Sequence, residues 1–326
     1  MKKKKLNLSS FRELGVIAMI VIIYAVVCII EPRFFSTTSL VNILLFFPFL
    51  LIVSLGEMIE IVSRNVDMSL GAILACSGYA AGLLFKTYSG LPIAVVFIAA
   101  IALGCVLGLI NGFIVTKFQI PSVIVTLGTM NVYRGVIFIL GGKQIDNSVI
   151  PQSLMALSQP KQSVIGIPYS VLIALLAAVL LALFLKYFRA GREIYEIGCN
   201  PAAASLRGIS NNRVQLFVFT LAGGLSGLAG MVFISRIGYM DPGAAGRGLE
   251  FTAIAAVVIG GTSMNGGVGK VTGTVLGCLL LGVIQNAISI TGISGYWQEA
   301  IYGIIIVVSV IIDNLIKNRL AVSEAR

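Results

Sequence analysis

Apolar runs long enough to cross a lipid bilayer recur along nearly the whole sequence, separated by short polar segments. An α-helix needs about 20 apolar residues to span the hydrocarbon core, and a bundle of such helices satisfies its own backbone there. A further run at residues 251–262 is too short to cross and predicts a half-length or re-entrant helix. The sequence therefore predicts an all-α polytopic membrane protein with about ten transmembrane or half-membrane helices. The long runs occupy residues 14–30, 41–62, 69–85, 92–116, 121–140, 171–187, 214–234, 272–290 and 297–312.

Charged residues are scarce and gather at the ends of these runs. Only 11% of the residues are charged and 58% are hydrophobic, which excludes a water-soluble globular protein. The net charge of +10 forms no basic stripe on a soluble segment, so it does not indicate a nucleic-acid binder. If both termini lie in the cytoplasm, the inside segments carry 16 of the 23 Lys and Arg residues and the outside segments carry 6. The remaining one lies within a span. The positive-inside rule favours this orientation.

The ends of the chain are expected to be cytoplasmic tails, at residues 1–13 and 317–326, around a membrane domain at 14–316. Four lysines followed by an apolar run also resemble a signal peptide. However, Glu31-Pro32-Arg33 follows the run where a small-residue cleavage site would stand, so we expect a retained first helix. The chain has five Cys without a CxxC pair, and no His, which argues against zinc or dithiol redox chemistry.

One long polar interruption divides the second half of the chain, at residues 189–213. It is rich in Arg and is therefore expected on the cytoplasmic side. Within it, Pro201 begins a run of good helix formers, and Gly208 follows that run. Pro in a first helical turn and Gly just past the last turn are typical of the two ends of a short helix. We expect a surface helix here, held outside the bilayer by the two flanking spans.

The residues of this loop carry a family resemblance. The loop is similar to the cytoplasmic coupling loop of ABC-importer permeases of the ribose and monosaccharide type, which docks on a separate ATPase subunit. The resemblance extends over nearly the whole chain, from about residue 32 to residue 313. The residues that it assigns to ATPase coupling are Gly191, Arg192, Gly198, Asn200, Ala203, Ala204 and Gly208.

The resemblance implies the permease subunit of an importer in a bacterial inner membrane, moving ribose, rhamnose, autoinducer-2 or a related sugar. It implies a dimer with a second copy or a paralogue, two cytoplasmic ABC ATPase subunits and an extracytoplasmic substrate-binding protein. ATP and Mg²⁺ would be bound by the ATPase. This chain would bind no cofactor itself and would catalyse no reaction.

A second match lies between the second and third spans. The run from Val66 to Gly71 resembles the family signature Gly-Ile-Asp-Leu-Ser-Val-Gly, whereas the Gly-Gly that usually precedes the signature is Arg64-Asn65 here. Asp67 and Ser69 stand just before an apolar helix. They could cap that helix by accepting backbone N–H groups, or they could contact the substrate.

Polar side chains inside the spans are candidates for the translocation path or a gate. Glu57 and Glu60 lie toward the cytoplasmic end of the second span, and Glu60 precedes Arg64 by four residues, the favourable helical pairing. They form either a snorkelling, partly paired cluster or a gate. Asn131 and Arg134 share a face of the fifth span, where Arg should face a cavity or a partner acid rather than lipid. The full set of path or gate candidates is Glu57, Asp67, Ser69, Asn131 and Arg134.

Three further features concern the loops and a repeat. The Gly-rich run 260–270 ends in Gly-Lys but is no phosphate loop, because Met264 and Val271 replace its required Gly and Ser or Thr. It matches a Gly-Gly turn of the family between two helices.

The loop 141–168 is expected outside, where a substrate-delivering protein could dock. Leu-Gly-Cys around Gly104 recurs around Gly277, which predicts an inverted repeat.

The main alternative function is an ATP-independent secondary transporter or channel for a small polar solute. Such a protein would need a coupling carboxylate at mid-membrane and would need no docking loop. A membrane-embedded enzyme is the third class, and the sequence offers it no His, metal cluster or nucleophile–base pair.

Overall fold

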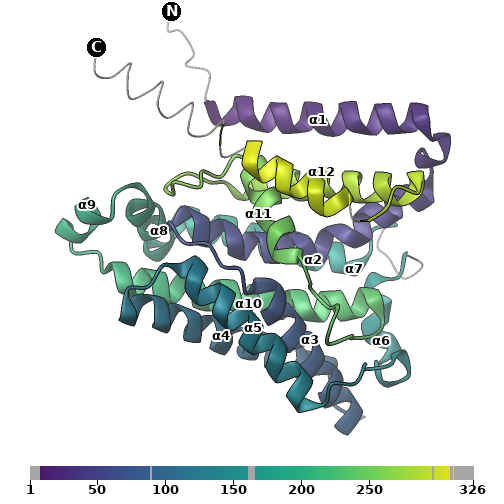
Figure 1. The fold of residues 1–326 in the computed structure, drawn as a ribbon, viewed down its shortest axis with the longest axis horizontal. Helices are drawn as coiled ribbons and strands as arrows, with labels where there is room; N and C mark the ends of the chain where they lie inside the picture. The colour runs from purple at the N-terminus through teal and green to yellow at the C-terminus, as the bar shows by residue number, and fades with distance from the viewer. Residues whose placement is uncertain (1–7, 89, 161–165, 296, 309–310, 312–326) are drawn as a thin grey trace, which may run out of the picture.

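The computed structural model describes residues 8–311, apart from 89, 161–165, 296 and 309–310. In these ranges the chain is a bundle of α-helices, and eight of them are long and apolar enough to cross a membrane (Figure 1). The predicted tail at 317–326 and the first seven residues lie outside the described part. The eight helices are α1 (Leu8–Ile30), α2 (Thr37–Val62), α3 (Leu70–Thr87), α4 (Ile93–Phe118), α5 (Ser122–Leu140), α7 (Tyr169–Tyr187), α10 (Asn211–Ile237) and α12 (Val271–Thr291).

Shorter helices complete the predicted all-α polytopic fold. The predicted half-length helix is confirmed as α11 (Leu249–Ile259), whose 11 residues span about 16 Å, half of a hydrocarbon core. The described part of the span predicted at 297–312 is an apolar helix over Trp297–Val308, and the rest of that span lies largely outside the described residues. The described part of the loop 141–168, which excludes residues 161–165, contains short helical turns, and an isolated antiparallel bridge joins its Ile145 to Met240. The remaining short elements are η1 (Pro32–Phe34), η2 (Asn147–Val149), α6 (Gln152–Met155), η3 (Ala156–Ser158), α8 (Arg189–Cys199) and α9 (Pro201–Leu206).

Proline and glycine set many of the helix ends. Pro92, Pro121 and Pro168 directly precede α4, α5 and α7, each with φ between −53° and −60°, the angle that the ring enforces. At the other ends, α10 and α12 stop at Gly238 and Gly292, both in the left-handed conformation that glycine adopts without a Cβ penalty.

The ends of the long helices gather at two opposite ends of the bundle. Gln119, after α4, donates to Asn212 at the start of α10, and the same end holds α8 and α9 (Figure 1). We call this the α8–α9 end. At the opposite end, Ile145, which follows α5, pairs with Met240, which follows α10, and Tyr79 in the middle of α3 donates to the carbonyl of Lys143. The chain therefore crosses back and forth as the charge pattern predicts, and the assignment of the α8–α9 end to the cytoplasm stays a prediction.

The helices differ strongly in burial. α2 lies at the centre, and the most apolar windows of α2, α3, α10 and α12 are mostly buried inside the bundle. α1 lies at the edge against α12 (Figure 1), and only 6% of its window is buried. The exposed apolar face of α1 is suited to contact with lipid.

Glycines allow a close contact between α4 and α10. A Cβ added to Gly104 would overlap the carbonyl of Gly223, and one added to Gly108 would overlap the carbonyl of Phe219. Small residues that bring helix backbones together are typical of membrane helix interfaces. Gly277, from the second copy of the faint repeat, touches Ala256 of α11 in the same manner. Both copies thus provide a close-packing glycine, while their inverted relation stays a prediction.

Candidate functional site

The predicted surface helix in loop 189–213 is confirmed as α9, and its ends have the expected chemistry. Asn200 occupies the N-cap and its side chain accepts the backbone N–H of Ala203 at 3.1 Å. Pro201 is the first helical residue. Gly208, two residues past the helix, has φ 81°, in the left-handed region that favours glycine. This ordered helix projects from the bundle at its α8–α9 end (Figure 1).

A second helix in the loop, α8, was not predicted. It buries Gly191, Ile194 and Ile197 on one face, at the spacing of three that marks a helix side. Gly191 packs directly on the last turn of α7, where an added Cβ would meet backbone atoms of Leu185. Arg192 donates to the carbonyl of Tyr187 at 3.1 Å. This bond supplies a donor to one of the last carbonyls of α7, which have no partner within the helix. These contacts fix α8 to the end of α7, so that α8 is part of the bundle.

The outer surface of α9 is small and apolar. Ala203 is exposed and Leu206 is 91% exposed, whereas Ala204 is buried against the bundle. Arg207 forms a largely exposed ion pair with Glu196 of α8 at 3.0 Å, and this pair connects the two helices. A hollow of about 310 Å³ lies between them. An exposed aliphatic side chain among small residues can act as an anchor in a pocket of another protein. The hollow is lined by Arg189, Arg192, Glu193, Glu196, Arg207 and Ile209.

Three chain segments meet at backbone contact beneath α8. Val62 ends α2 and its carbonyl accepts the N–H of Gly267 at 2.8 Å. A Cβ added to Gly198 would overlap both that carbonyl and the N–H of Gly267. Gly266 and Gly267 have φ 82° and 73°, which confirms the predicted Gly-rich turn. We call the contact among Val62, Gly198, Gly266 and Gly267 the glycine junction; it ties α8 to α2 and to the turn between α11 and α12.

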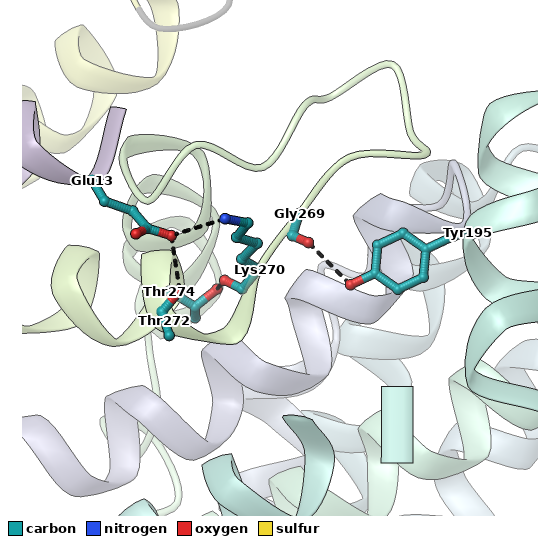
Figure 2. A network of polar contacts seen from close by, with 6 residues as sticks. All are labelled: Glu13, Tyr195, Gly269, Lys270, Thr272 and Thr274. Carbon is teal, nitrogen blue, oxygen red and sulfur yellow. Dashed lines mark hydrogen bonds and ion pairs between the residues drawn. The ribbon is translucent and has the colours of Figure 1, made fainter. Parts of the chain in front are cut away.

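A polar network beside the junction ties two further segments together (Figure 2). Tyr195 of α8 donates to the carbonyl of Gly269 at 3.0 Å. Burial raises the pKa of the Tyr195 phenol, so it remains a neutral donor. The next residue, Lys270, lies 3.4 Å from the carboxylate of Glu13, which also accepts from Thr272 (Figure 2). The start of α1 is thus placed at the α8–α9 end, as the predicted topology requires.

Asp67 and Ser69 belong to a buried hydrogen-bond network at the break between α2 and α3. Asn111 of α4 donates to Ser69 Oγ at 2.7 Å and to Asp67 Oδ2 at 3.3 Å. Tyr133 of α5 donates to Asn111 Oδ1 at 2.8 Å. The expected cap is only partly right: Asp67 accepts the N–H of Ser69, but Ser69 makes no side-chain cap bond at its N-cap position. The network joins three membrane helices around a buried carboxylate.

Glu57 and Glu60 are more deeply buried than their sequence position indicated. Both are 0% exposed, and none of their carboxylate oxygens has a hydrogen-bond partner among the described residues. The expected snorkelling cluster is therefore wrong. The expected pairing of Glu60 with Arg64 is wrong too, because Arg64 donates to backbone carbonyls of α8. α2 runs through the centre of the bundle, and that central position, invisible in its local pattern, buries both acids next to Asp67.

Asn131 and Arg134 have different surroundings. Asn131 is exposed and its amide bonds back to the carbonyl of Leu127 at 2.8 Å. Arg134 donates to the carbonyls of Ala245 and Gly246, both at 3.2 Å. The expected partner acid is present as Glu250, which interacts electrostatically with the guanidinium without a hydrogen bond in the described structure. The hydrogen bonds of Arg134 hold the turn that leads into α11. Irregular backbone at membrane depth needs such donors.

Removal of the Tyr133 hydroxyl is expected to destabilise the fold. Tyr133→Phe leaves the buried Asn111 Oδ1 without its donor, which costs about 1–3 kcal/mol. We expect a lower melting temperature in detergent. The matched variant Tyr239→Phe changes a half-exposed ring and should leave the melting temperature unchanged. Equal shifts in the two variants would contradict the assigned role of the network.

Sequence reasoning missed Asn111, Tyr133 and the role of Arg64. Asn111 was not singled out as a candidate, and a lone Asn inside an apolar span is the signal that could have marked it. Tyr133 gave no signal, because a Tyr in a membrane helix is also common as a packing residue. Arg64 stood out as a departure from the family pattern and as a possible partner of Glu60, and neither feature indicates a contact with α8.

Comparison with known proteins gives consistent matches along the chain. A family model described as branched-chain amino acid transport system / permease component matches residues 39–310. The ribose import permease protein RbsC of Haemophilus influenzae is 37% identical over 299 residues, covering 91% of both chains. The autoinducer 2 import system permease protein LsrC of Enterobacter sp. strain 638 is 32% identical, covering 95% of this chain and 88% of that protein. The D-allose transport system permease protein AlsC of Escherichia coli K12 is 34% identical, covering 97% and 96%. No solved structure matches the chain significantly.

Proposed function

The chain belongs to the family of branched-chain amino acid transport system permease components, and we propose that it is the membrane permease subunit of an ABC importer for a monosaccharide or sugar-like small molecule. The observation that carries the proposal is similarity over at least nine-tenths of the chain to permeases named for ribose, autoinducer 2 and D-allose. ATP and Mg²⁺ are bound by a separate subunit, and this chain provides the path.

The docking surface for that ATPase is assigned to α9 and the outer side of α8. Support comes from the exposed Leu206, the small Ala203 beside it, and the ion pair between Arg207 and Glu196. A surface that transmits force must be rigid, and α8 is fixed to the bundle through Gly198 at the glycine junction. The α8–α9 end then faces the cytoplasm, in agreement with the excess of Lys and Arg on that side.

The opposite end of the bundle is assigned to an extracytoplasmic substrate-binding protein. The described part of loop 141–168 is pinned there by the Ile145–Met240 bridge and the Tyr79 hydroxyl. A second permease copy or paralogue is assigned to the exposed side of α5. An exposed Asn131 at membrane depth is unfavourable in lipid. A second chain would cover its amide, or a water-filled path between the two chains would hydrate it.

Transport follows from rigid-body motion in this proposal. Closure of the ATPase pair would displace α8 and α9, and the packed helices would rock between outward-open and inward-open states. The polar groups assigned to the path are those of the α2–α3 break and of α5, with Asp67, Ser69, Asn131 and Arg134. Glu57 lies deeper, next to Asp67, and is assigned to the gate.

The source of energy separates this proposal from a secondary transporter. We expect uptake of labelled ribose or D-allose by cells carrying the chain to persist when a protonophore collapses the proton gradient while glycolysis maintains ATP. Uptake should fall to the level of a deletion strain when ATP is depleted. The reverse pattern, sensitive to the protonophore and insensitive to ATP, would assign the buried carboxylates Glu57 and Glu60 to proton coupling and overturn the proposal.

A further inference from the structure

Arg64 stands in a backbone conformation that an Arg rarely adopts. Its φ is 68°, and among the described non-glycine residues only Gln119 shares a positive φ. L-residues avoid this region because of their Cβ, and such a conformation persists where the surrounding structure holds it. Arg64 follows the last turn of α2, where a glycine would fit the backbone better. The contacts of the long cationic side chain are therefore of interest at this position.

The Arg64 side chain crosses to the end of α8. Its Nε donates to the carbonyl of Gly198 at 2.7 Å, and its Nη2 donates to the carbonyl of Cys199 at 2.9 Å. These are the last two residues of α8, whose carbonyls have no partner within the helix. The C-terminus of a helix also carries a partial negative charge, which a guanidinium complements. Arg64 thus caps a helix that lies more than 130 residues away in the sequence.

The position of the Arg64 side chain is fixed by the glycine junction. A Cβ added to Gly266 would overlap Arg64 Cγ, so the stem of the arginine lies directly on that turn. The fork of the guanidinium reaches two successive carbonyls, a geometry that the single ammonium of Lys does not reproduce. The contact is therefore specific to Arg and to the present position of α8.

Beyond Arg64, the chain is tied to the helices α4 and α5. We call residues 64–69 the α2–α3 connector. Its backbone N–H groups donate to hydroxyls on the first turns of α5, and its last residue is bonded by Asn111 of α4. The connector is thus attached to α8 at one end and to α4 and α5 along the rest. The bonds run from Val66 N to Ser122 Oγ (3.0 Å), from Met68 N to Thr126 Oγ1 (3.0 Å) and from Asn111 Nδ2 to Ser69 Oγ (2.7 Å).

We propose that Arg64 is a positioning residue that transmits displacement of α8 through the α2–α3 connector to α4 and α5. The proposal rests on the proposed function, because it takes α8 and α9 to be moved by an ATPase. A second connection from α8, between Tyr195 and Gly269, leads to the turn before α12 instead. Arg64 is the link toward the helix that carries Asn131 and Arg134.

Arg64→Gly tests this link without disturbing the backbone. Glycine tolerates φ 68° better than Arg does, so the variant should fold and assemble normally. In complexes co-purified with the ATPase subunit and reconstituted into liposomes, we expect basal ATP hydrolysis and ATPase retention to be unchanged. Substrate transported per ATP hydrolysed, driven by the binding protein, should fall about tenfold, the range of typical coupling between sites.

Two further variants make the test specific. Arg64→Lys keeps the backbone strain and the charge, but its ammonium group cannot donate to both carbonyls as the forked guanidinium does. Its transport per ATP should therefore lie between that of Arg64→Gly and that of the wild type. Arg33→Gly removes an 80% exposed arginine that pairs with Glu31 outside the bundle core, and it should transport as the wild type does.

The possible outcomes separate this inference from the proposed function. Wild-type transport per ATP in Arg64→Gly would overturn the inference alone, and so would loss of the ATPase subunit, which would make Arg64 part of the docking surface. A wild-type complex without ATP-dependent uptake would overturn the proposed function and the inference with it.

Discussion

Replacement of Ala203 by Glu is expected to reduce transport to background while the protein stays in the membrane. Ala203 lies on the exposed surface of α9, three residues after the N-cap Asn200. If that surface is covered by the ATPase, the new carboxylate is buried without a partner. Such a charge costs about 3 kcal/mol or more, which corresponds to a loss of affinity of roughly a hundredfold. The measurement is uptake, together with the amount of ATPase subunit retained by the purified permease.

The position of Ala203 makes this loss hard to explain by unfolding of α9. Glu three residues after an N-cap is favourable, because its carboxylate interacts with the N-terminal N–H groups of the helix. α9 itself should therefore be at least as stable in the variant. Ala203→Ser is the matched control, since it keeps a small side chain on the same surface, and it should transport normally. Normal transport by Ala203→Glu would show that α9 does not dock on a partner.

Replacement of Gly198 by Ala is expected to have the second largest effect. The added methyl group would overlap the Val62 carbonyl and the Gly267 N–H, so α8 must move away from α2. Overpacking of a tight contact costs about 3 kcal/mol at the upper end of its usual range. The displacement also lengthens the hydrogen bonds from Arg64 to the end of α8. We expect a lower melting temperature in detergent and a large loss of transport at equal protein level.

Gly15→Ala provides the control for this substitution. Gly15 lies in α1, and a methyl group added to it would have no neighbouring atom within 4 Å, so alanine adds no contact there. Alanine is also the better helix former, and the variant should be neutral or slightly more stable. If Gly198→Ala behaves like Gly15→Ala in melting temperature and transport, the backbone contact at the junction is not needed.

The parts of the fold that local chemistry determines were predictable. Pro201 and Gly208 marked the ends of α9, and the short apolar run before the Gly-rich turn marked α11 as a half-length helix. Helix α8 was missed because two of its inward positions are glycines, Gly191 and Gly198, which a hydrophobic pattern does not reveal. Their role is visible only once the neighbouring backbone of Leu185 and Val62 is in place.

The candidate site was only half predictable, for a similar reason. Asp67 and Ser69 were recognised together, but their partner Asn111 is more than 40 residues away, and local reasoning offered only a helix cap or a substrate contact. Arg64 was expected to pair with the nearby Glu60, yet it reaches α8. Long-range partners decide the role of a buried polar group, and one sequence does not contain the distances that select them.

Purification of the chain from its native membrane in mild detergent, with identification of the attached proteins, tests the central claim most directly. The account predicts an ABC ATPase subunit and a second permease chain in the complex, with the ATPase lost in Ala203→Glu and retained in Ala203→Ser. Clean permease without an ATPase, under conditions that preserve such complexes in a known importer, would contradict the account and favour a secondary transporter.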